Sequence, residues 1–189
     1  MNVLAHLYLS GESEDCMLGN FIGDFVKGKD YQDYPQEVQR GIFMHRAIDS
    51  FTDLHPLVLE VKGFFRNPYR KYAGVVVDIV FDYFLIKNWQ SYSDLTLRNY
   101  TQLAHAALLA RVRMLPKGAK GMLINFIRNK RILRYASLEG IEDTLLTMSK
   151  FTSLPNYASD AVRIIKENEE AINVRFLQFF AELREEVAK

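Results

Sequence analysis

The chain has 189 residues, of which 49% are hydrophobic and 13% aromatic, and its formal net charge is +1. This composition excludes a disordered chain and predicts one domain over residues 1–189 with enough apolar side chains for a core. The single cysteine, Cys16, excludes an internal disulfide. The chain start lacks a signal-like apolar run, so we expect a cytoplasmic protein without a membrane span.

Apolar residues recur at helical spacing along the whole chain and strand signals are scarce, which predicts an all-α, single-domain helical bundle. Breaks are expected near Gly28, Pro68, Pro116 and Pro155, where glycine, proline and asparagine gather. These breaks are short, so they indicate connections inside a domain rather than linkers. The expected helices cover residues 2–10, 15–27, 35–52, 56–65, 68–91, 95–114, 118–135, 138–151 and 156–187.

The first two expected helices each carry a polar pair four positions apart on an apolar side. Asn2 and His6 form the first pair, and Asn20 and Asp24 form the second. Gly23, beside Asp24, would let another backbone or a ligand approach closely. A lone histidine on an apolar face is usually a satisfied core residue, so the case for His6 depends on the polar residues expected around it.

His45 and Asp49 form the third pair, and they are the first place to look for chemistry. At about 100° per residue, they share a narrow arc of the expected helix with Val38 and Ile42. An isolated buried carboxylate is costly and needs a partner, a proton or a metal ion. The pair therefore indicates either a functional site or a buried ion pair.

Asp78 and Asp82 repeat this spacing in the most apolar of the expected helices. Two neighbouring carboxylates repel each other, and one pKa would rise strongly unless a cation lies close by. A divalent metal ion or an arginine would resolve the conflict. The structural alternative is a pair of buried salt bridges, for instance to Arg46 or Arg70.

Converging these pairs would enclose a His/Asp/Asn site within a helical bundle. Nitrogen and carboxylate ligands suit Mn, Fe, Zn or Mg, with Mg or Mn favoured because carboxylates dominate. The sequence has no Glu-x-x-His motif, which disfavours a ferritin-like di-iron centre. It also lacks a Walker loop, a Gly-x-Ser-x-Gly elbow and a cysteine-rich zinc motif.

Positive charge is concentrated in residues 95–138, here called the basic block, which contain no Asp or Glu. Such a block favours an acidic partner, which could be nucleic acid, phospholipid or an acidic protein. The alternative is a solvated face that neighbouring acidic helices balance. The residues expected to contact a partner are Arg111, Arg113, Lys117, Lys120, Arg128, Lys130, Arg131 and Arg134.

Several blocks of residues match a known family in order, and the match is most specific over residues 1–90. These blocks are Met1-Asn2, Leu4-Ala5-His6-Leu7, Gly19-Asn20, Asp24-Phe25-Val26, Gly28, Gly41-Ile42, Met44-His45-Arg46, Ile48-Asp49, Thr52-Asp53, Pro56, Asp78, Asp82, Phe84-Leu85 and Trp89. In them the chain resembles the acyl carrier protein phosphodiesterase family, the holo-acyl-carrier-protein hydrolases. Similarity is weaker at Leu115-Pro116 and in the last expected helix.

The resemblance implies a helical fold related to the HD phosphohydrolases. It also implies hydrolysis, assisted by manganese or else by magnesium or iron, of the phosphodiester between 4′-phosphopantetheine and a carrier-protein serine. The products would be apo carrier protein and free 4′-phosphopantetheine. Carrier proteins are small and acidic, which agrees with the basic block and makes a nucleic-acid partner unexpected.

The resemblance and the polar pairs together suggest roles for individual residues. The expected metal ligands are His6, Asp24, His45 and Asp78. The expected catalytic residues are Asp49, Asp82 and Arg46, the two carboxylates acting as ligands, orienting groups or general bases. Arg46 and Lys27 are expected to bind the substrate phosphate.

Two positions depart from the pattern of some family members, which carry histidine where this chain has Phe43 and Tyr83. Neither position lies on the polar-pair face of its helix, so we expect the change to be tolerated.

Two other functions stay open. One is an HD-like phosphohydrolase acting on a nucleotide or another phosphodiester, and the other is a non-catalytic helical module that binds acidic partners through the basic block.

Overall fold

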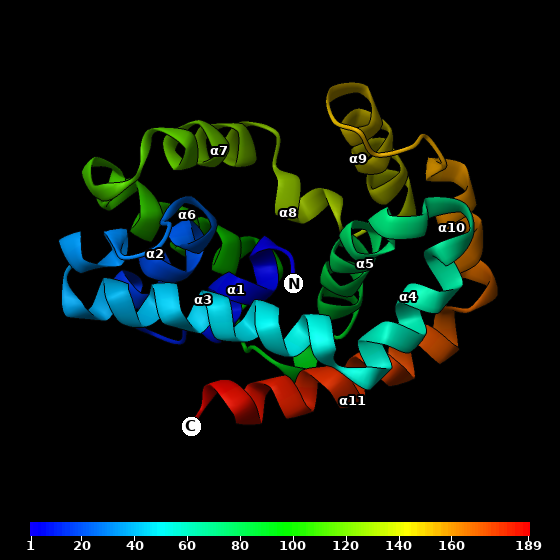
Figure 1. Cartoon of the computed structure of the whole chain (residues 1–189), viewed down its shortest axis with the longest axis horizontal. Coiled ribbons are helices and arrows are strands. Elements are labelled where there is room, and N and C mark those ends of the chain that lie inside the picture. Colours follow the sequence, from blue (N-terminus) through cyan, green and yellow to red (C-terminus); the bar gives the residue numbers. More distant parts are fainter. The chain divides into compact units, whose positions relative to one another are not determined.

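The computed structural model describes residues 1–189, and all its regular elements are helices, which confirms the all-α prediction (Figure 1). The α-helices are α1 (Val3–Leu9), α2 (Glu14–Ile22), α3 (Gln36–Leu54), α4 (Pro56–Tyr69), α5 (Ala73–Lys87), α6 (Leu97–Ala110), α7 (Lys117–Arg128), α8 (Arg131–Arg134), α9 (Leu138–Phe151), α10 (Ala158–Glu167) and α11 (Glu169–Val187). The 3-10 turns are η1 (Gly23–Phe25), η2 (Asp30–Asp33), η3 (Arg70–Tyr72), η4 (Trp89–Ser91) and η5 (Val112–Met114). None of the helices combines the length and the hydropathy needed to cross a bilayer.

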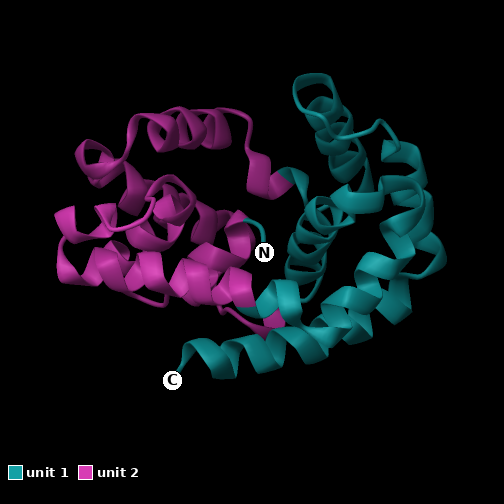
Figure 2. Ribbon diagram, in the orientation of Figure 1, with its two compact units in different colours: residues 1–2, 51–88, 134–189 teal, residues 3–50, 89–133 magenta.

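The chain forms two compact units, which Figure 2 shows in different colours. Unit 1 consists of Met1–Asn2, Phe51–Asn88 and Arg134–Lys189, and unit 2 consists of Val3–Ser50 and Trp89–Leu133. Each unit is thus assembled from segments that lie far apart in the sequence. The single domain over residues 1–189 and its relation to the HD phosphohydrolases stay predictions.

In unit 2, α2 packs against α1 and α6, and its backbone also crosses that of α3 at close range. Glycines make this crossing possible. A Cβ atom on Gly19 would lie 2.0 Å from the Val38 carbonyl oxygen, and one on Gly41 would lie 2.0 Å from the Cys16 carbonyl oxygen. Only residues without a Cβ permit such an approach. The crossing places the backbone of α2 around Gly19, and with it the neighbouring Asn20, against the buried side of α3.

In unit 1, α4 lies against α5, α10 and α11, while α9 lies against α5 and α10. Aromatic rings form much of the core. The ring of Phe81, on α5, meets Phe176 and Phe179 of α11 at centroid distances of 5.4 and 5.3 Å. All three side chains are fully buried. Because burying each such side chain stabilises a protein by about 1.5–3 kcal/mol, this cluster holds α5 and α11 together.

The break expected at Pro68 is a kink within α4 rather than the end of a helix. Asn67 has non-helical angles (φ −109°, ψ 102°), because a proline disfavours the α conformation of the residue before it. The chain then turns at Arg70, whose φ is 51°, and α5 begins only at Ala73. The prediction of one helix over residues 68–91 is therefore wrong at its start.

The prediction of one long helix over residues 156–187 is also wrong. Asn168 separates α10 from α11 with non-helical angles (φ −125°, ψ 21°). Its side-chain amide donates a hydrogen bond of 2.9 Å to the Ile164 carbonyl. An asparagine side chain competes in this way with the helix backbone for hydrogen bonds, so it can end a helix without proline or glycine.

The remaining boundaries agree with the predictions more closely. α9 begins and ends where expected, at Leu138 and Phe151. The helix expected over residues 118–135 is divided into α7 and α8, with Lys130 at a φ of 47° between them. The helix expected over residues 15–27 ends at Ile22 and continues as the 3-10 turn η1.

Candidate metal centre

Three side chains of unit 2 with metal-binding chemistry converge: His6 from α1, and His45 and Asp49 from α3. One ligand atom from each lies within 4.8 Å of the others. The Nε2 atom of His6 is 3.2 Å from Asp49 Oδ1, and the Nε2 atom of His45 is 3.1 Å from Asp49 Oδ2. The two imidazole rings stack with centroids 4.3 Å apart and an interplanar angle of 24°. One carboxylate therefore contacts two stacked imidazoles.

Burial is uneven across this group. His6 and His45 are buried, whereas the Asp49 side chain is 39% exposed. Asp24, on η1, brings a second carboxylate to the exposed side, with its Oδ1 3.4 Å from His45 Nε2 and its side chain 76% exposed. The imidazoles thus form the protected side of the group, and the carboxylates face solvent.

Asn20, on α2, orients both imidazoles. Its side-chain Oδ1 lies 2.7 Å from His6 Nδ1, and its backbone carbonyl oxygen lies 2.8 Å from His45 Nδ1. Carbonyl oxygens only accept hydrogen bonds, so each Nδ1 must carry a hydrogen. In the neutral form of either ring, Nε2 then holds the lone pair and faces Asp49. This is the arrangement in which histidine binds metal ions in proteins.

Further hydrogen bonds hold the Asn20 amide in this orientation. Its Nδ2 donates to the His6 carbonyl at 2.8 Å and to Ser10 Oγ at 3.0 Å. The Ser10 hydroxyl itself donates to the same His6 carbonyl at 2.8 Å. Because the His6 carbonyl cannot donate, the nitrogen of the amide has to face it, which leaves Oδ1 for the imidazole.

The predicted stacking of Asn20 and Asp24 one turn apart is wrong. α2 ends at Ile22, so the two residues do not lie on one α-helix. Asn20 is fully buried and serves the histidines, whereas Asp24 is exposed and approaches His45 from solvent. The orienting role of Asn20 was missed because its two partners lie 14 and 25 residues away.

Gly23 provides the space that the His45 ring occupies. A Cβ atom at Gly23 would lie 2.3 Å from His45 Cγ. A close approach was expected at Gly23 from a backbone or a ligand, and the group that approaches is instead the His45 side chain. Any larger residue at this position would displace the imidazole.

The electrostatics of the group favour one charged histidine. Burial disfavours a charge on His45, but Asp24 and Asp49 outweigh that effect and raise its pKa to about 9. Burial instead lowers the pKa of His6, which Asp49 only partly offsets. Burial would raise the pKa of Asp49, but its contacts with His45 and His6 hold that pKa well below its usual range. At neutral pH the metal-free group therefore contains cationic His45 and ionised Asp49.

The donor set fits a divalent metal ion. The buried His45 Nε2 forms no hydrogen bond, because its contacts with Asp24 and Asp49 have ion-pair distances without hydrogen-bond geometry. Two imidazole nitrogens and one or two carboxylates match the ligands that Mn, Fe and Zn accept. Bound metal would replace the proton of His45, as is usual when histidine becomes a ligand.

The other predicted acids lie on α5 of unit 1. The Asp78 Oδ1 atom is 3.3 Å from the amino group of Met1, and its side chain is 38% exposed. Asp82 is fully buried. The His6, His45 and Asp49 group is formed by residues of unit 2, so the roles of Asp78 and Asp82 stay predictions.

Arg46 directly follows His45 and holds the loop that carries Lys27. Its Nη2 donates to the carbonyls of Val26 at 3.0 Å and Gly28 at 3.4 Å. Its guanidinium also lies 5.7 Å from the centroid of the Tyr31 ring. Lys27 itself is exposed. Of the two residues expected to bind phosphate, Lys27 thus lies on this loop and Arg46 lies against it from α3, where two of its hydrogen bonds already stabilise the loop.

Phe43 and Tyr83 lie away from the polar-pair faces, as expected. Phe43 is 46% exposed and packs edge-on against Tyr31 with a centroid distance of 4.7 Å. The Tyr83 hydroxyl donates to Glu169 at 3.1 Å, and burial together with that carboxylate raises its pKa to about 12. Tyr83 therefore remains a neutral hydrogen-bond donor.

Some cations of the basic block form ion pairs with acidic side chains and others do not. Arg111 forms ion pairs with Asp15 and, at 2.6 Å, with Glu14, so the balanced-charge alternative holds for this residue. Arg134 belongs to unit 1, whereas the others belong to unit 2. Of the cations expected to contact a partner, those of unit 2 that form no ion pair are Arg113, Lys117, Lys120, Arg128 and Lys130. Unit 2 therefore carries several positive charges of the basic block that no acidic side chain balances.

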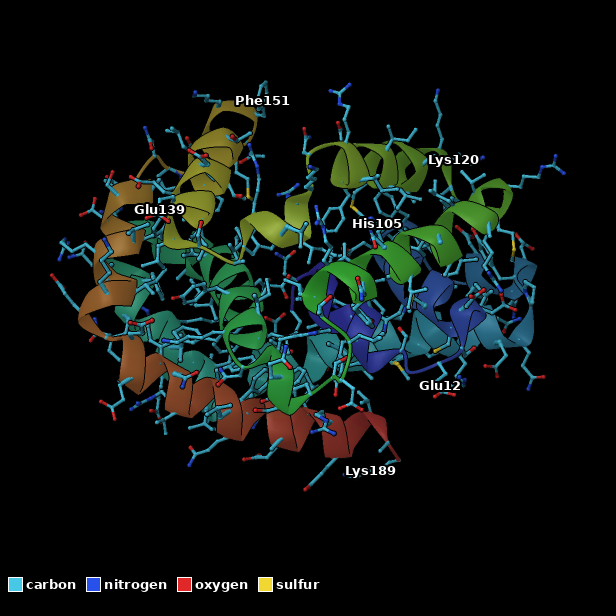
Figure 3. The ribbon with its side chains drawn as sticks, turned by 180° about the vertical axis from the view of Figure 1, so that it is seen from behind. Glu12, His105, Lys120, Glu139, Phe151 and Lys189 are labelled. Carbon is cyan, nitrogen blue, oxygen red and sulfur yellow. The ribbon has the colours of Figure 1, made fainter.

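Helix α7 presents part of this charge around an exposed apolar residue. Lys117, Ile124 and Arg128 follow one another at helical spacing, and Ile124 is 59% exposed. Figure 3 shows Lys120 on the same helix and His105 on α6 beside it, where the His105 ring meets Phe126 edge-on at 6.3 Å. An apolar centre with a basic rim is typical of a protein-binding surface.

Comparisons with a family model and with individual known proteins point to the same family. The family model described as acyl carrier protein phosphodiesterase matches residues 1–183. A relative of that name from Yersinia enterocolitica serotype O:8 is 35% identical over 150 residues, which cover 79% of this chain and 78% of the relative. Relatives of the same name from Yersinia pestis and Escherichia coli O6:K15:H31 are 31% identical over 181 and 193 residues, covering 95% and 100% of this chain and 94% and 98% of the relatives. No solved structure matches the chain significantly.

Proposed function

The chain belongs to the acyl carrier protein phosphodiesterase family, and we propose that it hydrolyses the phosphodiester joining 4′-phosphopantetheine to a serine of acyl carrier protein. The products are apo acyl carrier protein and 4′-phosphopantetheine. The observation that carries this proposal is the convergence of His6, His45 and Asp49, with Asn20 presenting both Nε2 atoms to the carboxylate.

The proposed cofactor is a divalent metal ion held by His6, His45 and Asp49. Mn²⁺ is our first choice, with Fe²⁺ and Mg²⁺ as alternatives, because two nitrogen ligands suit Mn²⁺ and Fe²⁺ better than Mg²⁺. When bound, such an ion lowers the pKa of a water molecule and polarises phosphoryl oxygens.

The protein side chains supply orientation and proton transfer in this proposal. Asn20 keeps both Nε2 lone pairs directed at the centre, and Gly23 leaves room for the His45 ring. The serine oxygen of the carrier protein needs a proton as it leaves. Asp24 is the most exposed carboxylate of the group, and its contact with His45 lowers its pKa, so it stays in the proposal as an ionised further ligand of the metal ion. Asp78 and Asp82 stay in the proposal as a further ligand and a further acid or base.

The proposed phosphate-binding residues are Lys27 and Arg46, which lie on or against one loop beside Asp24. Phosphate oxygens accept strong hydrogen bonds from both cation types. The guanidinium of Arg46 has five N–H donors, and its bonds to the loop carbonyls use only some of them. The remaining donors can bind phosphate.

The proposed partner surface is the set of exposed cations on the basic block, with Ile124 of α7 at its apolar centre. An acidic carrier protein would be attracted to this surface by charge, which mainly accelerates encounter and selects the orientation. The single cysteine, Cys16, favours a reducing compartment, so a cytoplasmic location is part of the proposal.

The direct test incubates the pure protein with holo acyl carrier protein and Mn²⁺, followed by mass spectrometry. Removal of the prosthetic group should lower the carrier-protein mass by about 340 Da, the size of this covalent modification. His45→Ala should abolish the mass loss while retaining helical content by circular dichroism. A folded wild-type protein that causes no mass loss with Mn²⁺, Mg²⁺ or Fe²⁺ would refute the assigned reaction.

A further inference from the structure

A pocket in unit 2 opens beside the turn that carries Asp24. Its volume is about 490 Å³, and its apolar wall consists of Phe25, Val26, Tyr34, Pro35, Met114 and Pro116. Sites for small organic ligands usually have volumes of about 300–1,000 Å³, so this pocket is large enough for one. It shares the segment 24–26 with the candidate metal centre, because Phe25 and Val26 directly follow Asp24.

The polar residues of the pocket define which ligand it accepts. Asp30 and Asp33 lie in its wall, and no lysine or arginine does. Carboxylates accept hydrogen bonds and repel anions, so the pocket suits a neutral ligand with N–H or O–H donors along an apolar chain. A nucleotide polyphosphate or a free fatty acid would bring negative charge against these carboxylates.

The wall next to the metal centre is held from two sides. Arg46 Nη2 donates to the Val26 carbonyl at 3.0 Å. On the other side, the first turn of α7 packs on Phe25 so closely that a Cβ atom on Gly118 would lie 2.9 Å from the phenyl ring. The wall of the pocket is therefore fixed by these contacts, and it connects η1 with the start of α7.

We propose that this pocket binds the pantetheine arm of the substrate, and this assignment rests on the proposed function above. Beyond its phosphate, the arm is a neutral chain with two amides, a hydroxyl group and a terminal thiol. Its N–H and O–H groups would donate to Asp30 and Asp33, and its methyl groups and thiol would contact the apolar wall. The phosphate would then lie near Asp24, and the carrier protein would lie toward Lys117, which follows Pro116 of the wall.

The test uses pantetheine itself, which lacks the phosphate and so reports on the pocket alone. Binding to the whole protein is measured by isothermal titration calorimetry for the wild type, for Pro35→Trp and for Pro56→Trp. Pro35 and Pro56 are both exposed prolines at the start of a helix, α3 and α4, so the second variant is a matched control. Mn²⁺ binding by each variant checks that the fold is retained.

The wild type and Pro56→Trp should bind pantetheine equally, whereas Pro35→Trp should bind it at least about tenfold more weakly, since the indole fills the pocket. For holo acyl carrier protein, Pro35→Trp should raise KM more than it lowers kcat. Equal binding by wild type and Pro35→Trp, or no binding by the wild type, would overturn the assignment even if hydrolysis proceeds. Binding that Pro35→Trp abolishes supports the pocket even if no carrier protein is cleaved, and the proposed function alone would then fail.

Discussion

The backbone carbonyl of Asn20 accepts a hydrogen bond of 2.8 Å from Nδ1 of His45, and this bond decides which nitrogen of His45 faces the candidate metal centre. The Asn20 side chain does the same for His6 at 2.7 Å. A single residue of α2 thus orients two imidazoles from two other helices. Because one bond uses the backbone and the other uses the side chain, substitution separates them.

Asn20→Ala should release His6 while keeping the His45 bond, which belongs to the backbone. We expect Mn²⁺ affinity to fall by about 10- to 100-fold, as for other residues that orient metal ligands. Stability should fall by about 1–3 kcal/mol, because the His6 carbonyl and Ser10 lose a buried partner. Calorimetric titration measures the affinity, and ¹⁵N chemical shifts of the imidazoles report the tautomer of His6.

Ser10→Ala is the control for this variant, since Ser10 contacts the Asn20 amide but neither imidazole ring. It should change stability without changing the tautomer of either histidine. Unchanged Mn²⁺ affinity in Asn20→Ala would contradict the orienting role.

Gly23→Ala should displace the His45 ring, because the new methyl group would lie 2.3 Å from Cγ. The backbone at Gly23 is already right-handed helical (φ −51°, ψ −39°), so the substitution acts through this contact and not through backbone strain. We expect hydrolysis to fall by about 100-fold or more, since misplacement of a reacting group by about 1 Å has this effect.

Gly63→Ala on α4 is the matched control, because no atom lies within 4 Å of its new methyl group. Replacing an exposed helical glycine by alanine should stabilise the protein by about 0.5–1 kcal/mol and leave hydrolysis unchanged. Equal activity of both glycine variants would argue against a fixed position for His45.

The stability of the metal-free protein should depend on pH through His45, whose pKa is raised from 6.5 to about 9 by Asp24 and Asp49 against the effect of burial. A raised folded-state pKa adds stability that is fully present below pH 6.5 and is lost as the pH rises through about 9. In excess EDTA, the melting temperature of the wild type should therefore fall relative to His45→Gln between pH 6.5 and 9.5.

His105→Gln is the control for this pH series, since burial lowers the pKa of His105 and no carboxylate opposes it. The melting curve of this variant should keep the alkaline loss of the wild type. The pH dependence that Asp49 contributes has the opposite direction. Because its pKa in the folded protein lies below the ordinary value of 3.8, Asp49 adds stability at pH values above 3.8, and this stability is lost as the pH falls. A wild type and a His45→Gln variant with parallel pH profiles would show that the ion pair is not formed.

Lys117→Glu should weaken the productive encounter with acyl carrier protein. Lys117 is exposed at the start of α7 and forms no ion pair. We expect KM for holo acyl carrier protein to rise by about three- to tenfold at low ionic strength, and the effect should shrink as salt screens the charges. The control is Lys150→Glu, which reverses the charge of an exposed residue on α9 outside the basic block and should leave KM unchanged. Equal effects of the two reversals would exclude α7 as the docking surface.

Some features of the candidate site follow from local sequence and others do not. His45 and Asp49 were predicted as neighbours because helical spacing alone places them one turn apart, and their 3.1 Å contact confirms it. The supposed pair of Asn20 and Asp24 failed because α2 ends between them. A helix that passes into a 3-10 turn at a glycine keeps the same apolar pattern, so the periodicity could not reveal the end.

Helix boundaries show the same division. Pro68 and Gly28 indicated irregular backbone at their positions because their covalent structure restricts or frees φ whatever the surroundings. Asn168 gave no such signal, since an asparagine ends a helix only where its side chain bonds to the backbone, as it does here to Ile164.

The sequence by itself determined the all-α class, the His45 and Asp49 pair and the concentration of positive charge in residues 95–138, because these depend on composition and on spacings within one turn. Only the tertiary structure decided that His6 stacks on His45 and that Asn20 presents both imidazoles to Asp49. Those contacts require α1, α2 and α3 to pack at close range, and that depends on the crossing of Gly19 with Gly41, which lie 22 residues apart. Helical periodicity describes one helix at a time and contains no information on which faces meet.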